Sequence, residues 1–225
     1  MKESILIHPL SDSNSVRDES FFTGHAFSAS SPETADEVRQ VILCCAAHGI
    51  TITPHGGLTG INGAGTATNN HSMNLQHLTG VSYRAKDNTL WALDGTTFSE
   101  IETSVRKESN MTREFPASPT EKSATIGGAL SFGARGLRSY KYGSVSDFVT
   151  ELEYCDCNGN LHLCSASDSN FHDLLGSEGM LGIITGVRIR TSPIPKFLWG
   201  LMFFFPDSLC AAGFADAVKN IEHIS

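Results

Sequence analysis

The chain has 225 residues, a formal net charge of −8 and an ordinary globular composition in which 40% of residues are hydrophobic. This length can bury a sizeable core and can hold one large domain or two small ones. The acidic balance and the lack of a Lys/Arg-rich cluster argue against nucleic acid or an anionic membrane as a partner. No apolar run approaches the roughly 18 residues needed to span a bilayer.

The cysteines lack the C-x-x-C spacing of zinc sites and of iron–sulfur clusters, so we expect reduced thiols and no metal. Because Cys155 and Cys157 lie two residues apart, they are expected to pack on one face of a strand. The N-terminal residues do not resemble the start of a signal peptide, which predicts a cytoplasmic protein, at most peripheral to a membrane through a partner. The six cysteines are Cys44, Cys45, Cys155, Cys157, Cys164 and Cys210.

The first clear element is a helix over residues 31–49. Ser31 suits an N-cap, Pro32 suits the first helical position, and Gly49 ends the pattern. Apolar side chains recur on one face of this helix, at Val38, Val41, Ile42, Cys45 and Ala46. A short strand is predicted directly after it, over residues 50–53.

A glycine-rich stretch follows this strand, with five glycines between Pro54 and Gly65. Glycine tolerates positive φ and has no side chain, so such a run can turn its N–H groups around an anion, most simply a phosphate. The stretch has neither the Gly-Lys-Ser/Thr ending of a nucleotide P-loop nor the G-x-G-x-x-G spacing of a dinucleotide site. A flexible surface loop is the alternative interpretation.

Two further strands are predicted near residues 73–75 and 90–93. Thr97 and Glu100 form a capping box that opens a helix with Phe98, Ile101 and Val105 facing inward. Residues 1–112 are therefore predicted to form a first subdomain, a small parallel or mixed α/β unit.

Antiparallel pairing is predicted for the next part of the chain. Asn158-Gly159 separates two strand patterns, residues 148–157 and 160–164, as in a β-hairpin. Small residues gather at 124–129, where the paired glycines suggest a close approach of a ligand or of another backbone, and again at 176–182. With a strand over 183–190, these segments make a second subdomain over residues 113–195.

Residues 196–225 are predicted to begin a third domain. Residues 197–205 are apolar on both faces, which favours a strand buried in a sheet that is covered on both sides. A helix is predicted over residues 209–224. If this strand lacks neighbours, it is expected to form a homodimer contact or to fold over the neighbouring cleft.

Together the small-residue clusters resemble the FAD-binding domain of the vanillyl-alcohol oxidase / p-cresol methylhydroxylase (PCMH) superfamily, and most of all its glycolate oxidase and D-lactate dehydrogenase branch. The resemblance covers roughly residues 20–205. It rests on the loop 54–63, on the segment from Ser123 to Gly143, and on the Gly-Ser-Glu-Gly-Met-Leu-Gly run that starts at Gly176. It implies an α+β fold of two FAD-binding subdomains, followed by the start of a C-terminal cap domain.

The resemblance also implies which residues bind FAD. The N–H groups of the first loop would hold the pyrophosphate, the second cluster would back it and line the channel, and the third would meet the ribityl and adenosine end. The implied residues are His55, Gly56, Gly57, Leu58, Thr59 and Gly60, then Pro116, Thr125, Gly127, Gly128, Gly133 and Gly136, and finally Glu178, Gly179, Gly182 and Ile184.

Some positions depart from the family pattern. His55 stands where an arginine is usual, and Leu58 stands at a glycine position, where we expect it to keep an unstrained backbone. Relatives that attach the flavin covalently use a histidine that aligns nearer Thr59, so non-covalent FAD is expected here.

The function implied is that of an FAD-linked oxidoreductase in which hydride passes from a 2-hydroxy acid such as glycolate or D-lactate to flavin N5. An iron–sulfur or other acceptor subunit would take the electrons. In this family the cap carries most catalytic groups, so the catalytic residues of this chain are unassigned. The alternative is a non-catalytic flavin-binding or interaction subunit that needs a partner to complete its site.

Overall fold

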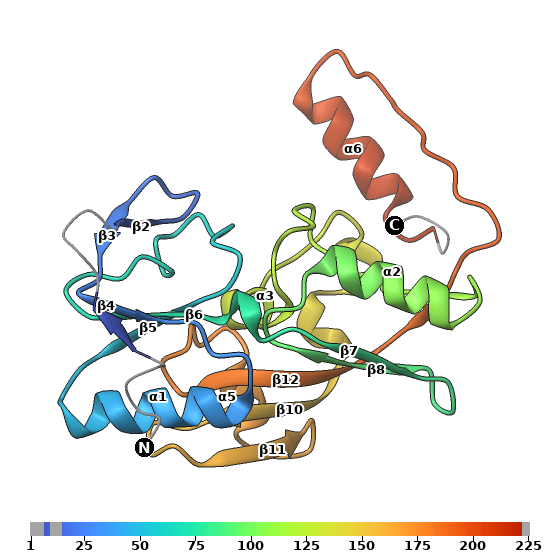
Figure 1. The fold of residues 1–225 in the computed structure, drawn as a ribbon. Helices are drawn as coiled ribbons and strands as arrows, with labels where there is room; N and C mark the ends of the chain where they lie inside the picture. The colour runs from blue at the N-terminus through green and yellow to red at the C-terminus, as the bar shows by residue number, and fades with distance from the viewer. Residues whose placement is uncertain (1–6, 10–14, 222–225) are drawn as a thin grey trace.

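The computed structural model describes residues 7–9 and 15–221 and shows a mixed α/β fold with several sheets (Figure 1). The α-helices are α1 (Ala35–Ala47), α2 (Phe98–Glu108), α3 (Ile126–Phe132), α4 (Ser139–Tyr142), α5 (Phe171–Leu174) and α6 (Ser208–Val218), with 3₁₀ turns η2 (Leu75–His77) and η3 (Val145–Phe148). The strands are β1 (His8–Pro9), β2 (Ser15–Arg17), β3 (Thr23–His25), β4 (Ser28–Ser30), β5 (Ile52–His55), β6 (His71–Asn74), β7 (Val81–Arg84), β8 (Thr89–Leu93), β9 (Arg113–Glu114), β10 (Val149–Cys155), β11 (Leu161–Ser165), β12 (Ile183–Arg190) and β13 (Ser192–Pro193).

A small sheet in the order β1-β4-β6-β5 carries the glycine-rich loop. β4 and β5 both run parallel to β6, so their carboxyl ends meet at one edge of the sheet. His71 on β6 is fully buried and bonds Ser28 and Ser30 of β4 through its two ring nitrogens, each at 2.8 Å. Burial lowers the pKa of His71 to about 4, so a neutral imidazole joins the two strands.

The larger sheet has five antiparallel strands in the order β11-β10-β12-β8-β7. β7 and β8 belong to it, because β8 pairs with β12 from Gly186 to Arg190. The strand expected at residues 90–93 is confirmed, but its assignment to the first subdomain's sheet is wrong. Local pattern indicates a strand without indicating its partner. The division of the chain at residue 112 stays a prediction.

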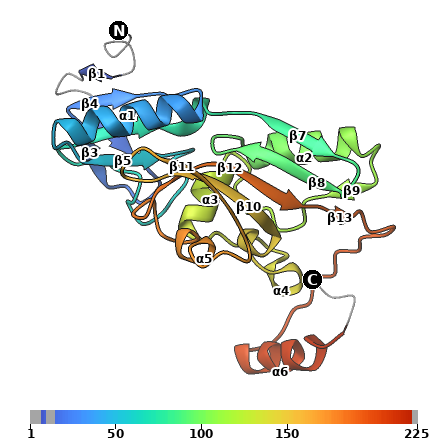
Figure 2. The same cartoon turned by 90° about the horizontal axis from the view of Figure 1, so that it is seen from below.

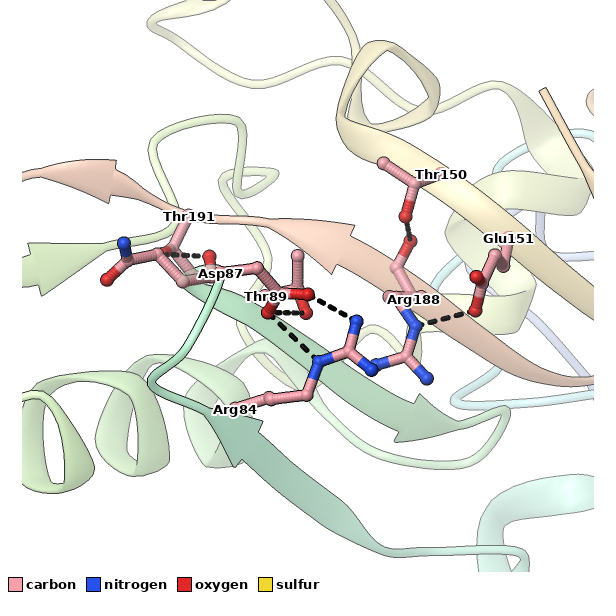
Figure 3. Close-up of polar contacts among 8 residues, drawn as sticks. Arg84, Asp87, Thr89, Thr150, Glu151, Arg188 and Thr191 are labelled. Atoms are coloured by element: carbon pink, nitrogen blue, oxygen red, sulfur yellow. Dashed lines mark hydrogen bonds and ion pairs between the residues drawn. The ribbon is translucent and has the colours of Figure 1, made fainter. Parts of the chain in front are cut away.

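Polar contacts join four strands of the larger sheet on one face (Figure 3). Arg188 on β12 donates a hydrogen bond to Glu151 on β10 at 2.6 Å, and its guanidinium lies 5.3 Å from the ring of Trp91 on β8. At the turn between β7 and β8, Asp87 accepts hydrogen bonds from both Arg84 and Thr89. This face carries ion pairs because the core lies on the other side of the sheet.

The main core lies where α2, α3 and α5 cover the five-stranded sheet. Phe98, Ile101 and Val105 of α2 are all fully buried, and the capping box between Thr97 and Glu100 is present, as the sequence predicts. A second core joins α1 to the small sheet and to the ends of β10 and β12. The second core therefore connects the two sheets through α1, which lies along the small sheet (Figure 2).

α1 keeps its predicted buried face but starts later than expected. The N-cap is Thr34, whose hydroxyl accepts from the N–H of Glu37 at 3.2 Å, and not Ser31. Pro32 consequently lies before the helix. Ser31 and Thr34 both suit an N-cap, so the local sequence alone does not determine at which of them the helix begins.

The hairpin of β10 and β11 is confirmed, with Gly159 at φ +75° in its loop. The last pair of residues in the β10–β11 register is Cys155 with Leu161, so Cys157 lies in the loop and is exposed. The expectation that Cys155 and Cys157 share a strand face is therefore wrong. All six cysteines are free.

The strand expected over residues 197–205 is absent, and this correction has a simple cause. A strand needs a neighbouring strand to satisfy its backbone, and no described strand pairs with this segment. Its side chains are exposed, for example 81% for Phe197 and 82% for Trp199. It packs on α6 instead, where the ring centroids of Phe203 and Phe214 lie 4.6 Å apart. Most of both segments stands away from the body (Figures 1 and 2), although Tyr140 donates a hydrogen bond to the carbonyl of Lys219 at 2.9 Å. The helix expected to reach residue 224 ends at Val218, and residues 222–225 lie outside the described part.

None of the described helices combines the length and the apolar character needed to cross a membrane.

The exposed segment leads to a prediction about association. Cutting the chain after Pro195 should change the melting temperature of the body by less than about 2 °C, because little of that segment packs on it. It should also reduce self-association, since a large apolar patch is removed. Light scattering and thermal melts of both versions test this. Loss of several degrees, or monomers of equal solubility in both cases, would contradict it.

Candidate functional site

A cleft of about 440 Å³ opens between the small sheet and α3. The glycine-rich loop forms one wall, starting at the carboxyl end of β5, and residues 119–135 form the other. Such crevices beyond the carboxyl ends of parallel strands are a common place for ligands in α/β folds. The predicted residues that line it are His55, Gly56, Gly57, Leu58, Thr59, Gly60, Thr125, Gly128 and Glu178.

Two of the loop glycines are required by the protein itself. A Cβ on Gly56 would lie 2.1 Å from the Thr125 hydroxyl, and a Cβ on Gly57 would lie 2.7 Å from the carbonyl oxygen of Ser123. The loop therefore packs directly against the residues at the start of α3. The sequence predicts close approach at these glycines, and the structure shows that the chain itself makes it, through the Thr125 side chain at Gly56 and through a backbone carbonyl at Gly57.

Gly60 is different, because it lines the cleft and no part of the chain fills the space that its side chain would take. Gly128 also lines the cleft, but a Cβ there would lie 3.0 Å from the Thr125 hydroxyl. A Cβ on Gly60 would meet its nearest neighbours, Asn62 and Asp18, only at 3.6 and 3.8 Å. At Gly60 the chain has space for a side chain and does not use it. The bare backbone on this wall fits a cofactor that must approach the loop closely.

Leu58 adopts φ +54°, in the left-handed region. The expectation that it keeps an unstrained backbone is therefore wrong. Left-handed backbone costs a residue with a Cβ roughly 1–2 kcal/mol, which is why glycine is favoured there. The loop holds the glycine-type conformation at this position even though the glycine is missing.

His55 is turned toward the sheet. Its Nε2 lies 3.1 Å from the hydroxyl of Ser72 on β6, and its Nδ1 lies 3.3 Å from the carbonyl oxygen of Gly56. Burial lowers the pKa of His55, so a neutral ring forms part of the cleft wall.

The third cluster is bonded to the other two. Asn62 of the first loop donates to the Glu178 carboxylate at 2.8 Å, and the N–H of Glu178 donates to Ser131 of α3 at 3.0 Å. Glu178 has φ +52° and Gly179 has φ +79°, so a tight turn presents this carboxylate at the cleft. All three small-residue clusters therefore meet around one space.

Several predicted residues lie outside the cleft lining. A Cβ on Gly127 would lie 1.5 Å from Asp94 Oδ1, and one on Gly136 would lie 2.0 Å from the carbonyl oxygen of Ser118. At both glycines another part of the chain therefore occupies the space that a side chain would need. Pro116 lines a separate pocket, and Gly133 ends α3 at φ +76°. A small cavity behind the loop is lined by Gly179, Gly182 and Ile184. Contact of these residues with FAD stays a prediction.

Sequence reasoning missed five charged or polar lining residues: Asp18, Asn62, Thr120, Glu121 and Arg135. Asp18 follows a weakly patterned segment, and nothing local indicates that the β2–β3 hairpin brings it to the loop. Arg135 is the one Lys or Arg among the described lining residues, beside three carboxylates. An anion bound here must therefore be held largely by backbone N–H groups and the dipoles around them.

The comparisons with known proteins agree with this geometry. Residues 29–165 match a family model described as an FAD binding domain. The chain belongs to this family of FAD-binding domains.

Curated relatives of the FAD-binding domain include enzymes for several substrates. The chain is 28% identical over 178 residues to a D-lactate dehydrogenase of Anaerostipes hadrus, covering 75% of this chain and 37% of that protein. It is 29% identical to the glycolate oxidase subunit GlcD of Bacillus subtilis, covering 73% and 37%. It is also 31% identical to the mitochondrial D-2-hydroxyglutarate dehydrogenase of Rattus norvegicus, covering 73% and 32%. The chain thus spans about two fifths or less of these relatives.

Solved structures show the same fold at low identity. A grass pollen allergen variant, Phl p 4 N158H, described as a glucose dehydrogenase, superposes with a TM-score of 0.74 at 22% identity, over 84% of this chain and 42% of that one. An alkyldihydroxyacetonephosphate synthase superposes with a TM-score of 0.69 at 22% identity, over 77% and 34%. The expected fold of a PCMH-type FAD-binding domain is confirmed.

The strained backbone at Leu58 generates a prediction. Leu58→Gly should be more stable than Leu58→Ala by roughly 1 kcal/mol, because both remove the side chain and only glycine relieves the left-handed conformation. In ordinary backbone the order is reversed. Urea unfolding of the two variants measures the difference. An alanine variant as stable as the glycine variant would show that the φ angle carries no strain.

Proposed function

We propose that this chain binds FAD non-covalently, with the diphosphate against the glycine-rich loop and the start of α3. The observation that carries this proposal is the meeting of three small-residue clusters around one cleft, with unused side-chain space at Gly60. Membership of the FAD-binding family supports the identity of the ligand.

The residues of the chain have binding and orienting roles in this proposal. The amides of the loop at Leu58, Thr59 and Gly60 bind the diphosphate, and Glu178 accepts hydrogen bonds from hydroxyl groups of the cofactor. Covalent attachment is disfavoured, because the histidine of covalently linked relatives aligns nearer Thr59 than His55 and because His55 is hydrogen-bonded to Ser72. Bound FAD supplies a hydride acceptor, and this domain supplies its position.

We further propose that the whole protein oxidises a 2-hydroxy acid. D-lactate, glycolate and D-2-hydroxyglutarate appear in the names of three relatives, and all three molecules carry a hydroxyl group next to a carboxylate. A hydroxy acid substrate, an iron–sulfur or other electron-accepting partner, and a homodimer are the partners that this function proposes.

Binding at the loop is tested at Gly60, where a side chain does not disturb the chain. In Gly60→Ala the added methyl group should keep the diphosphate away from the loop N–H groups. FAD affinity should fall about tenfold or more, the effect of losing one hydrogen bond to a charged group, with little change in melting temperature. Flavin fluorescence titration measures the affinity. Gly200→Ala is a matched control, because a Cβ there meets nothing within 4 Å and Gly200 lies in the segment away from the cleft. Equal affinity of wild type and Gly60→Ala would contradict the proposed position of the cofactor.

The substrate class is tested on the whole protein loaded with FAD. Anaerobic addition of D-lactate, glycolate or D-2-hydroxyglutarate should bleach the flavin absorbance, whereas propionate, which lacks the hydroxyl group, should not. Bleaching by none of the three acids would overturn the 2-hydroxy acid proposal and leave the FAD-binding proposal intact.

A further inference from the structure

Asp94 is a buried carboxyl group that the function described so far does not use. It directly follows β8, is 3% exposed, and its Oδ2 has no hydrogen-bond partner in the described part of the chain. Its backbone is firmly held: the N–H donates to Thr185 of β12 at 3.1 Å, and the carbonyl accepts from the N–H of Gly127 at 3.0 Å. A polar group that is buried without a partner is costly, so it calls for an explanation.

The second glycine cluster is built around this carboxyl group. A Cβ on Gly127 would lie 1.5 Å from Oδ1 and 2.2 Å from Cγ of Asp94, so the carboxyl group takes the space that the glycine leaves. The two adjacent glycines of α3, Gly127 and Gly128, therefore have different structural roles. Gly127 makes room for Asp94, and Gly128 lines the cleft.

Asp94 forms part of the wall of a cavity of about 40 Å³ that lies behind the glycine-rich loop. All three small-residue clusters contribute to this wall: His55 and Gly56 from the first, Gly128 from the second, Gly179 from the third. Since a water in liquid occupies about 30 Å³, the cavity has room for one. His55 and Ser131 are polar residues that also line this cavity.

Burial also determines the charge of Asp94. Desolvation raises its pKa to about 8, so the carboxyl group is neutral at pH 7 and can donate a hydrogen bond. Around the cavity, β5 contributes His55 as the other ionisable residue, and the lining residues from η2, α3, β12 and the loop before β12 are uncharged. Burial lowers the pKa of His55, so its ring stays neutral above pH 7.

We propose that Asp94, in its protonated form, is a binding group for the cofactor's diphosphate: it donates a hydrogen bond to a water in this cavity, and the water bridges to a phosphate oxygen. This inference rests on the proposed FAD site. An ionised Asp94 would place a negative charge behind the loop that binds the dianion. Cofactor affinity is therefore coupled to the proton on Asp94.

The test is FAD affinity at pH 7 and pH 9, measured by flavin fluorescence. With a pKa of about 8, the protonated fraction of Asp94 falls about tenfold between pH 7 and pH 9. If the ionised form does not bind, the FAD affinity of the wild type should fall by the same factor. Asp94→Asn keeps the shape of the side chain and a hydrogen-bond donor but does not titrate. The FAD affinity of this variant should therefore change less than about twofold between pH 7 and pH 9. Asp173→Asn makes the same change on an exposed residue of α5 and should behave as wild type.

A second measurement needs no variant and covers the case in which Asp94→Asn does not fold. Titration calorimetry of wild type at pH 8.5, in two buffers of different ionisation enthalpy, should show net proton uptake on FAD binding, because the bound dianion favours the protonated carboxyl group. Binding without proton uptake, or an equal pH dependence in wild type and Asp94→Asn, would overturn the inference and leave the FAD site standing. Failure of wild type to bind FAD at both pH values would overturn both.

Discussion

The contact between the glycine-rich loop and the start of α3 is the constraint on which the rest of the structure depends. Gly56 and Gly57 bring the loop against Thr125 and Ser123 at distances that exclude a Cβ. This contact joins the small sheet, which carries the loop, to the helix that covers the large sheet. The cleft lies beside this contact, because Gly56, Gly57 and Thr125 all line it.

Further contacts connect the three small-residue clusters and support this one. The bond from Asn62 to Glu178 connects the first cluster to the third, and the N–H of Glu178 connects the third cluster to α3. Asp94 and Gly127 connect β8 to the same helix from the buried side. A single cooperative arrangement of small residues thus forms both the cleft and the cavity behind it, which is why the sequence contains clustered glycines rather than clustered charges.

Sequence reasoning succeeded where the signal is local. The capping box at Thr97, the buried face of α1 and the β10–β11 hairpin follow from residues within one element. It failed where the answer depends on a distant segment: the partner of β8 and the missing strand at residues 197–205. Leu58 belongs to the second kind, because the loop imposes a left-handed conformation that leucine itself disfavours.

The candidate site shows the same division. The glycine pattern marked where close approach occurs, but it could not say whether a ligand or another part of the chain makes it. At Gly127 the space is taken by Asp94, and Gly57 lines the cleft while it packs against Ser123. Gly60 lines the cleft with its side-chain space unused. Asp18 and Arg135 were missed because chemistry-bearing residues without a motif become visible only when the fold brings them together.

If three separate clusters bind one cofactor, amide hydrogen exchange with and without FAD should show it in one experiment. Exchange should slow on FAD addition in all three clusters, at residues 56–60, 125–128 and 176–182, and should stay unchanged at residues 197–205. Protection in none of the clusters, or protection confined to residues 197–205, would contradict it.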